Sequence, residues 1–294
     1  MAEKIEFKSN INARDLVNAK KNKPNNFQKK FEAYLNNVSP WPISYDVDST
    51  QPINFTEFSY TDVFGGFYLN TQSIEINCRV MEAASKEYCD DWLLFDTLKN
   101  SISDKYELRS LSDVKDNLKI LYMVGHNMFD MVSSEIMGRL AHEEGLDFCV
   151  KLHPLTDYDH TKKIARIVGW NRIVPPNLSG YAFLDKASIV YTTTASEFTM
   201  SAVLKGKEII NVSNFYNESS GIYYPISRLL YNSDNPKQIL NNILNCPWSG
   251  LISQFIQDDA KVRMEKYFEK AFELREKHGT IASVSHLKKI PINP

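Results

Sequence analysis

Three short segments carry residue types that can bind a phosphate or take part in acid–base chemistry. Gly125-His126-Asn127 follows one apolar run, Lys151 and His153 bracket the last residue of another, and residues 192–197 read Thr-Thr-Thr-Ala-Ser-Glu. A strand interior disfavours charge, so a lysine and a histidine at its end are expected to face a ligand. Lys151 can neutralise a phosphate, and His153 can bind a phosphate or sugar oxygen. Solvated side chains are the alternative for this pair.

The first segment suits a phosphate at the start of a helix. Gly125 leaves room for the anion, and His126 or Asn127 can donate a hydrogen bond to it. Asn127 can equally be a simple helix cap. His126 is also a candidate for acid–base chemistry.

The serine- and threonine-rich segment resembles a diphosphate site more closely. The hydroxyls of Thr193, Thr194 and Ser196 are expected beside backbone N–H groups at the positive end of a helix. Glu197, in the first turn, can accept hydrogen bonds from two ribose hydroxyls. It can equally complement the helix dipole or complete a cap, and both alternatives stay open.

The elements that must position these segments alternate regularly along the chain. Short apolar runs separated by helical patterns predict five strands, at 118–124, 147–152, 172–174, 188–191 and 208–212. Continuous apolar runs of this kind indicate strands covered on both faces, as in a parallel, doubly wound sheet. Because the carboxyl ends of parallel strands meet at one edge, the three segments are expected to converge there.

The N-terminal third shows less regularity. Gly65-Gly66, between apolar residues, predicts a tight turn or a close backbone approach, and on the functional interpretation a glycine loop that lines the acceptor side of a cleft. Asp62 lies beside it. A polar stretch before residue 118 suggests domains at 1–117 and 118–250. A helix and tail at 251–294 are expected to pack back across them.

Several protein classes lack support in this sequence. The chain has no G-x-G-x-x-G after a strand, no Walker A loop, no H-E-x-x-H and no G-x-S-x-G. A formal net charge of -2 over 294 residues gives no global basic field. No apolar run has the length of a membrane span. The four cysteines are scattered without a C-x-x-C pair, so we expect a cytoplasmic protein with reduced thiols and no zinc.

The ordered motifs resemble a known family. Lys-Leu-His-Pro at 151–154, Thr-Thr-Thr-Ala-Ser at 192–196 and a helix ending in Leu-Lys-Gly-Lys at 204–207 are similar to the C-terminal nucleotide-sugar domain of GT-B glycosyltransferases. The capsule-polysaccharide and glycerophosphate-polymer transferases are the most similar in pattern. The chain departs from that pattern at Ser201, where the family usually has glutamate, and at Glu208, where it usually has proline.

The resemblance implies an α/β, GT-B-like protein with two Rossmann-like domains, the N-terminal one short. The C-terminal domain would bind a nucleotide sugar as co-substrate, with no metal and no other cofactor. The N-terminal domain would supply the base that deprotonates the acceptor hydroxyl in an inverting enzyme. Asp62 is the first candidate for that base and His126 the second.

Two acceptors and two other functions stay open. The acceptor can be a growing surface glycan, or a hydroxymethylated base in phage DNA, in which case the enzyme would work in the host cytoplasm. The DNA hypothesis needs a basic face, which lysine pairs such as Lys20-Lys21, Lys29-Lys30 and Lys288-Lys289 can supply. The other functions are a sugar-nucleotide 2-epimerase of the same fold and a non-catalytic nucleotide-binding module.

Overall fold

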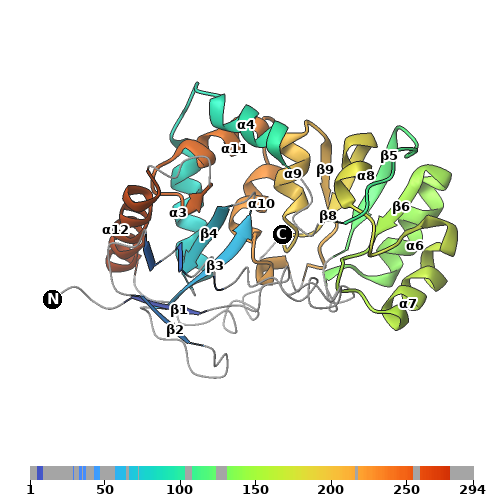
Figure 1. Ribbon diagram of the computed structural model, residues 1–294, viewed down its shortest axis with the longest axis horizontal. Coiled ribbons are helices and arrows are strands. Elements are labelled where there is room, and N and C mark those ends of the chain that lie inside the picture. The colour runs from blue at the N-terminus through green and yellow to red at the C-terminus, as the bar shows by residue number, and fades with distance from the viewer. Residues whose placement is uncertain are drawn as a thin grey trace. The chain divides into compact units, whose positions relative to one another are not determined.

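The chain forms two compact units, each with its own five-stranded sheet (Figure 1). The computed structural model describes residues 5–8, 29, 33–34, 36–37, 43–46, 57–63, 66–71, 73–102, 108–123, 131–215, 218–253 and 259–278. Unit 1 comprises residues 1–95 and 238–294, and unit 2 comprises residues 96–237. Residues 238–250 therefore cluster with unit 1, whereas the sequence analysis placed them in the second domain.

Unit 2 contains the regular α/β segment. Its strands are β5 (Leu118–Tyr122), β6 (Phe148–Lys151), β7 (Ile173–Val174), β8 (Ala187–Thr192) and β9 (Glu208–Asn211). They are hydrogen-bonded in the order β7-β6-β5-β8-β9, and every neighbouring pair is parallel. The predicted α/β class with a five-stranded parallel sheet is confirmed.

Helices cover both faces of this sheet. They are α6 (Ser134–Glu143), α7 (Tyr158–Val168), α8 (Gly180–Lys186), α9 (Phe198–Leu204) and α10 (Tyr224–Tyr231), with short turns η1 (Gly145–Asp147), η2 (Trp170–Arg172) and η3 (Glu218–Ser220). Leu121 and Val150 pack against α6 and α7 in one buried cluster, whereas Ile120 and Val190 pack against α8 and α9 in another. Successive strand residues point to opposite faces, so continuous apolar strands supply both clusters.

Side-chain caps fix where three of these helices begin. Ser133, Asp157 and Ser179 each accept a hydrogen bond from a backbone N–H in the first turn of α6, α7 and α8, respectively. Gly206 has a φ of 69° directly after α9, a conformation that favours glycine and ends the helix. The four cysteines are free thiols, and burial raises the pKa of Cys149 to about 12, so this thiol stays protonated.

Unit 1 is built on a mixed sheet. Its strands are β1 (Ile5–Lys8), β2 (Ile43–Asp46), β3 (Glu57–Val63), β4 (Gly66–Thr71) and β10 (Leu251–Ile252), in the order β10-β4-β3-β1-β2. β1 is parallel to β2 and β3, whereas β4 is antiparallel to β3 and β10. The two-domain GT-B arrangement implied by the resemblance stays a prediction.

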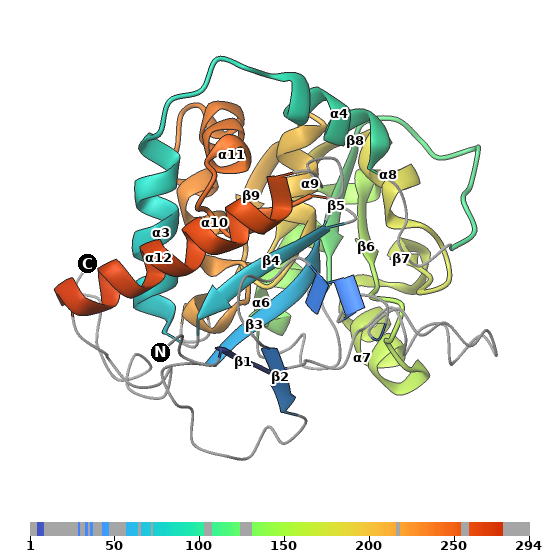
Figure 2. The ribbon, with the colours of Figure 1, turned by 60° about the vertical axis from the view of Figure 1, so that its left-hand side comes forward.

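Helix α12 (Ala260–His278) completes the core of unit 1. Together with α3 (Ile74–Lys86) it packs on β4, where Phe67, Leu69, Tyr267 and Phe268 are fully or almost fully buried (Figure 2). The sequence pattern extended this last helix back to residue 252. The structure instead pairs Leu251–Ile252 with β4, and α12 begins at Ala260.

One predicted helix is divided in two. The pattern over residues 78–98 predicts a single helix, but α3 ends at Lys86 and α4 (Leu93–Ser101) follows a short connection. Amides of α11 (Pro236–Asn245) bind that connection: Asn242 accepts a hydrogen bond from the Cys89 N–H at 3.1 Å and donates one to the Ser85 carbonyl at 2.8 Å. These long-range bonds satisfy backbone groups that a continuous helix would have paired internally.

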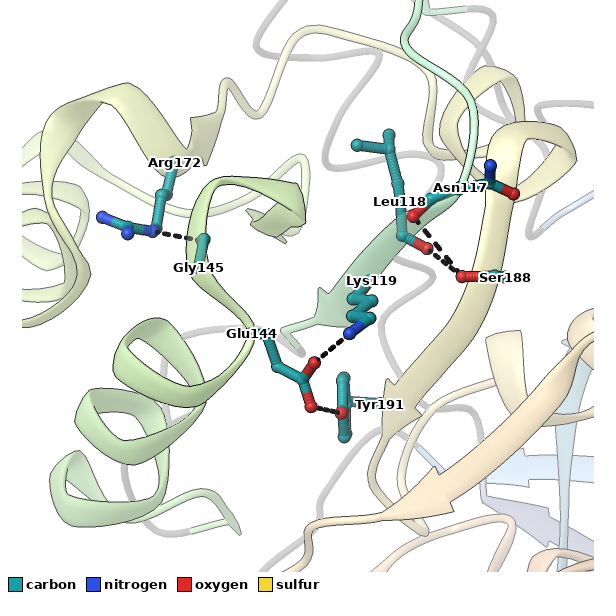
Figure 3. A network of polar contacts seen from close by, with 8 residues as sticks. All are labelled: Asn117, Leu118, Lys119, Glu144, Gly145, Arg172, Ser188 and Tyr191. Carbon is teal, nitrogen blue, oxygen red and sulfur yellow. Dashed lines mark hydrogen bonds and ion pairs between the residues drawn. The ribbon is translucent and has the colours of Figure 1, made fainter.

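A polar network joins α6 to the two central strands of unit 2 (Figure 3). Glu144, at the C-terminal end of α6, accepts hydrogen bonds from the Lys119 ammonium of β5 and, at 2.6 Å, from the Tyr191 hydroxyl of β8. These two bonds, with Lys119 the larger cause, hold the pKa of Glu144 below its ordinary value of 4.5.

The network predicts a pH dependence of stability. A carboxyl group whose pKa is lower in the folded state stabilises the protein above its unfolded-state pKa, and that contribution is lost as the pH falls through the folded-state pKa. We therefore expect Glu144→Gln to be destabilising near pH 7, with a difference from the parent chain that shrinks below about pH 4.5. Urea unfolding across this range measures it, with Glu135→Gln, an exposed carboxylate on the same helix, as control. An equal difference at every pH would contradict this role.

Candidate functional site

The strand order creates one edge suited to a ligand in unit 2. From β5 the chain continues to β6 and β7 on one side of the sheet, whereas β8 and β9 lie on the other side. In open parallel sheets, ligands bind beyond the carboxyl ends of the two strands at which the order reverses, here β5 and β8. The segment with Gly125, His126 and Asn127 follows β5 and lies outside the described residues.

Lys151 is the last residue of β6, next to β5. Its side chain is buried, with 4% exposed, and its ammonium group donates a hydrogen bond to the Leu152 carbonyl. Burying a charge is costly, so lysine is rarely buried this deeply unless its amino group has a partner. Lys151 therefore brings an amino group, a hydrogen-bond donor, to the predicted edge.

His153 lies in the turn after β6. The Leu155 N–H donates a hydrogen bond to its Nδ1 at 3.1 Å. Nδ1 is thus the acceptor, and the neutral ring carries its proton on Nε2. His153 can then donate a hydrogen bond from Nε2, and its binding of a phosphate or sugar oxygen stays a prediction.

In the threonine-rich segment after β8, several polar groups form hydrogen bonds with other groups of the protein. The Thr194 hydroxyl donates to the Glu218 carbonyl at 2.6 Å, and the Thr194 N–H donates to the Ser213 hydroxyl at 3.0 Å. The Ser196 hydroxyl accepts from the Phe198 N–H at 3.2 Å. These bonds shape the loop between β8 and α9, and a donor-binding role for Thr194 and Ser196 stays a prediction.

Thr193 differs from its neighbours. Its side chain is fully buried, and its hydroxyl has no hydrogen-bond partner among the described residues. An unpaired buried hydroxyl costs roughly 1–3 kcal/mol, so native proteins seldom keep one without a functional reason. Thr193 shares this property with other described residues, among them Thr156 in the loop after β6, Ser201 of α9 and Ser227 of α10.

A cluster of hydroxyls lies directly behind this segment. Thr199 of α9 contacts the Thr192 hydroxyl at 2.9 Å and the Tyr231 hydroxyl of α10 at 3.0 Å, and Tyr231 also contacts Thr192. Burial raises the pKa of Tyr231 to about 12, so the phenol stays protonated. Tyr231 and Glu218 were not predicted from the sequence, because no local motif marks residues that reach this loop from later in the chain.

Glu197 immediately precedes α9, and its side chain makes no capping hydrogen bond. The interpretation of Glu197 as a helix cap is therefore wrong. Its predicted contact with ribose hydroxyls stays a prediction.

The acceptor-side candidates belong to unit 1. β3 and β4 form a hairpin in which Val63 pairs with Gly66, and a Cβ on Gly66 would lie 2.0 Å from the Ile252 carbonyl oxygen. The predicted close backbone approach is thus confirmed at Gly66. Gly65 and the side chain of Asp62 lie outside the described part, although the Asp62 backbone pairs with Phe67 in this hairpin. Their roles toward an acceptor stay predictions.

The described residues contain neither a cluster of metal ligands nor a membrane-spanning helix. No three His, Cys, Asp or Glu side chains gather there in a way that could hold a metal ion. No helix within the described ranges combines the length and apolar character needed to cross a membrane. Metal independence stays a prediction.

Comparison with known proteins gives only distant structural likenesses. No protein-family model and no curated protein matches the chain. Among solved structures, the chain is similar to KpsC of Thermosulfurimonas dismutans, a beta Kdo 2,7 transferase, with 9% sequence identity and a TM-score of 0.45. The match covers 91% of this chain and 99% of that chain. A likeness at this level assigns no activity.

Proposed function

We propose that this protein is a glycosyltransferase that binds a nucleotide sugar at the carboxyl edge of the sheet in unit 2. One observation carries the proposal: three side chains of suitable chemistry follow the strands around the reversal of strand order. They are a buried lysine, an imidazole that can donate from Nε2 and a buried hydroxyl without a described partner. They belong to Lys151, His153 and Thr193. A diphosphate has the charge and the acceptor oxygens that such a set would bind.

The proposed reaction exchanges one bond at the sugar. The acceptor hydroxyl attacks the anomeric carbon, the bond from that carbon to the diphosphate oxygen breaks, and the nucleoside diphosphate leaves with the bonding electrons. Lys151 and His153 would stabilise the negative charge that develops on the leaving group. The hydroxyl proton would pass to a base, for which Asp62 and His126 are the candidates. No metal ion takes part in this proposal.

The acceptor is either a surface glycan or a hydroxymethylated base in phage DNA. Of the lysine pairs that would favour DNA, the described part of the chain contains only Lys29, which is exposed. A sugar-nucleotide 2-epimerase and a non-catalytic nucleotide-binding module are the alternatives.

Nucleotide binding gives the first test. A ligand at a hundred times its Kd stabilises a protein by about 2.7 kcal/mol, which for a chain of 294 residues raises the melting temperature by about 4 °C. We expect such a rise with one of the common nucleoside diphosphates or its sugar conjugates, UDP included, when each is screened by thermal shift. The absence of a rise with every compound would refute the proposal.

Product analysis separates the alternatives once a donor binds. Transfer of radiolabelled sugar to an oligosaccharide or to hydroxymethylated DNA would support the transferase and identify the acceptor class. Conversion of the bound sugar nucleotide to its 2-epimer would instead support the epimerase. Binding without either product would indicate the non-catalytic module.

A further inference from the structure

Exposed aromatic and basic side chains lie together on α7 and the turn that follows it. Tyr158, Lys162 and Arg166 are spaced four residues apart on α7, so they share one side of the helix, and Lys163 is next to them. All four are exposed, as is Trp170 in η2. The exposed fractions of Tyr158 and Trp170 are 70% and 55%, large values for aromatic side chains.

One exposed aliphatic side chain lies in η1, a turn that is hydrogen-bonded to η2. Leu146 in η1 is 81% exposed, and the Arg172 Nε of η2 donates to the neighbouring Gly145 carbonyl at 3.2 Å (Figure 3), which ties the two turns together. The Tyr158 and Trp170 rings stack with centroids 6.4 Å apart. We call this set the α7 surface; it consists of Leu146, Tyr158, Lys162, Lys163, Arg166 and Trp170.

The cations of the α7 surface are not neutralised within the protein. Elsewhere in unit 2, lysines form ion pairs with acids, for example Lys186 with Asp116 at 2.7 Å and Lys205 with Asp185 at 3.1 Å. None of the three cations on the α7 surface has an ion pair with a described residue. Two acids lie at the N-terminal end of α7. The Asp157 carboxylate contacts the His160 ring at 2.8 Å, and Asp159 is exposed. The surface is therefore locally positive on a chain whose net charge is -2.

We propose that the α7 surface docks the protein on an anionic lipid membrane. Lysine and arginine are attracted to anionic headgroups, whereas tryptophan and tyrosine favour the boundary between headgroups and acyl chains. Leu146 offers only hydrocarbon, so it gains free energy only by leaving water for an apolar phase. An acidic polysaccharide or a nucleic acid would use the cations and the ring faces, but would give Leu146 no such environment. The inference does not depend on the donor site.

Sedimentation of the full chain with vesicles tests this proposal. We expect the chain to sediment with vesicles of phosphatidylcholine mixed with phosphatidylglycerol, not with phosphatidylcholine alone, and to be released by salt. The double variant Lys162→Gln/Arg166→Gln should bind at least about tenfold more weakly than the parent chain. Each basic residue near the surface contributes to the attraction. Trp170→Ser should also weaken binding.

Matched variants elsewhere serve as controls. Lys99→Gln/Lys261→Gln removes two exposed charges, and Tyr88→Ser removes an exposed ring, from other helices and loops, so both should bind like the parent chain. All variants should keep the parent melting temperature because the altered side chains are exposed. Failure of the parent to bind mixed vesicles, or equal binding by the α7 variants, would overturn the proposal. So would retention on heparin or duplex DNA without vesicle binding, which would indicate a polymer site.

Discussion

Replacing Lys151 with methionine is expected to weaken the binding of the nucleoside diphosphate found by the screen by roughly ten- to a hundredfold. A hydrogen bond to a charged group contributes about 1.5–3 kcal/mol, and every 1.4 kcal/mol corresponds to a factor of about ten in affinity. Methionine keeps the unbranched chain of Lys151 but removes the ammonium group that donates to the Leu152 carbonyl. Isothermal titration of parent and variant measures the loss directly.

The stability of the same variant shows whether Lys151 serves binding or folding. Exchanging a buried charge for an apolar side chain of similar volume is often neutral or stabilising, so the melting temperature without ligand should stay the same or rise. Lys207→Met is the matched control, because Lys207 also donates to a carbonyl, that of Asp185 at 2.8 Å, but precedes β9 at the opposite edge of the sheet. If the Lys151 variant and the parent bound the nucleoside diphosphate with equal affinity, the ligand would have to bind elsewhere than at this edge.

Gly66→Ala is expected to destabilise unit 1 by about 3 kcal/mol or more, in the upper range for overpacking. The added Cβ would lie 2.0 Å from the Ile252 carbonyl oxygen and 2.6 Å from the Ser253 Cα. Both are backbone atoms, so no side-chain rotation relieves the clash, and β4 must separate from β10. Urea unfolding and the melting temperature measure the effect.

A second glycine provides the control for this substitution. Gly138 lies inside α6, and a Cβ there would meet only the Ile167 Cγ2 at 3.8 Å, an ordinary contact. Gly138→Ala is therefore expected to stabilise the protein by up to about 1 kcal/mol, through helix propensity. If both variants changed stability by the same small amount, β10 would not approach Gly66 as the structure shows.

Most strands of unit 2 were predictable from the sequence, because short apolar runs and the residues that end them mark strands locally. Apolar runs at 118–124 and 208–212 become β5 and β9, which end at Tyr122 and Asn211. Helices cover both faces of β5, whereas β9, at the edge of the sheet, is exposed or half-buried. Each run holds only one charged residue, and polar or glycine residues mark its end. The sequence likewise indicated that Lys151 and His153 end a strand, since a charged pair beside a proline does not continue a buried run.

The hydrogen-bond partner of each hydroxyl group could not be predicted from the local sequence pattern. The sequence treats Thr193, Thr194 and Ser196 alike, but the structure pairs the hydroxyls of Thr194 and Ser196 with backbone groups and leaves that of Thr193 without a described partner. The partner of Thr194 is Glu218, which packing after β9 brings to this loop, whereas Ser196 bonds locally to the Phe198 N–H. The acceptor-side residues of unit 1 had even weaker local signals.

By itself, the sequence determined the alternation of strands and helices, the α/β class and the strand ends that carry a cation and an imidazole. Only the tertiary structure decided the order of the strands, the return of Leu251–Ile252 to pair with β4, and the collection of three cations without ion pairs on the α7 surface. The physical reason is range: periodicity and capping act over a few residues, whereas strand order and ion pairing depend on contacts between distant segments.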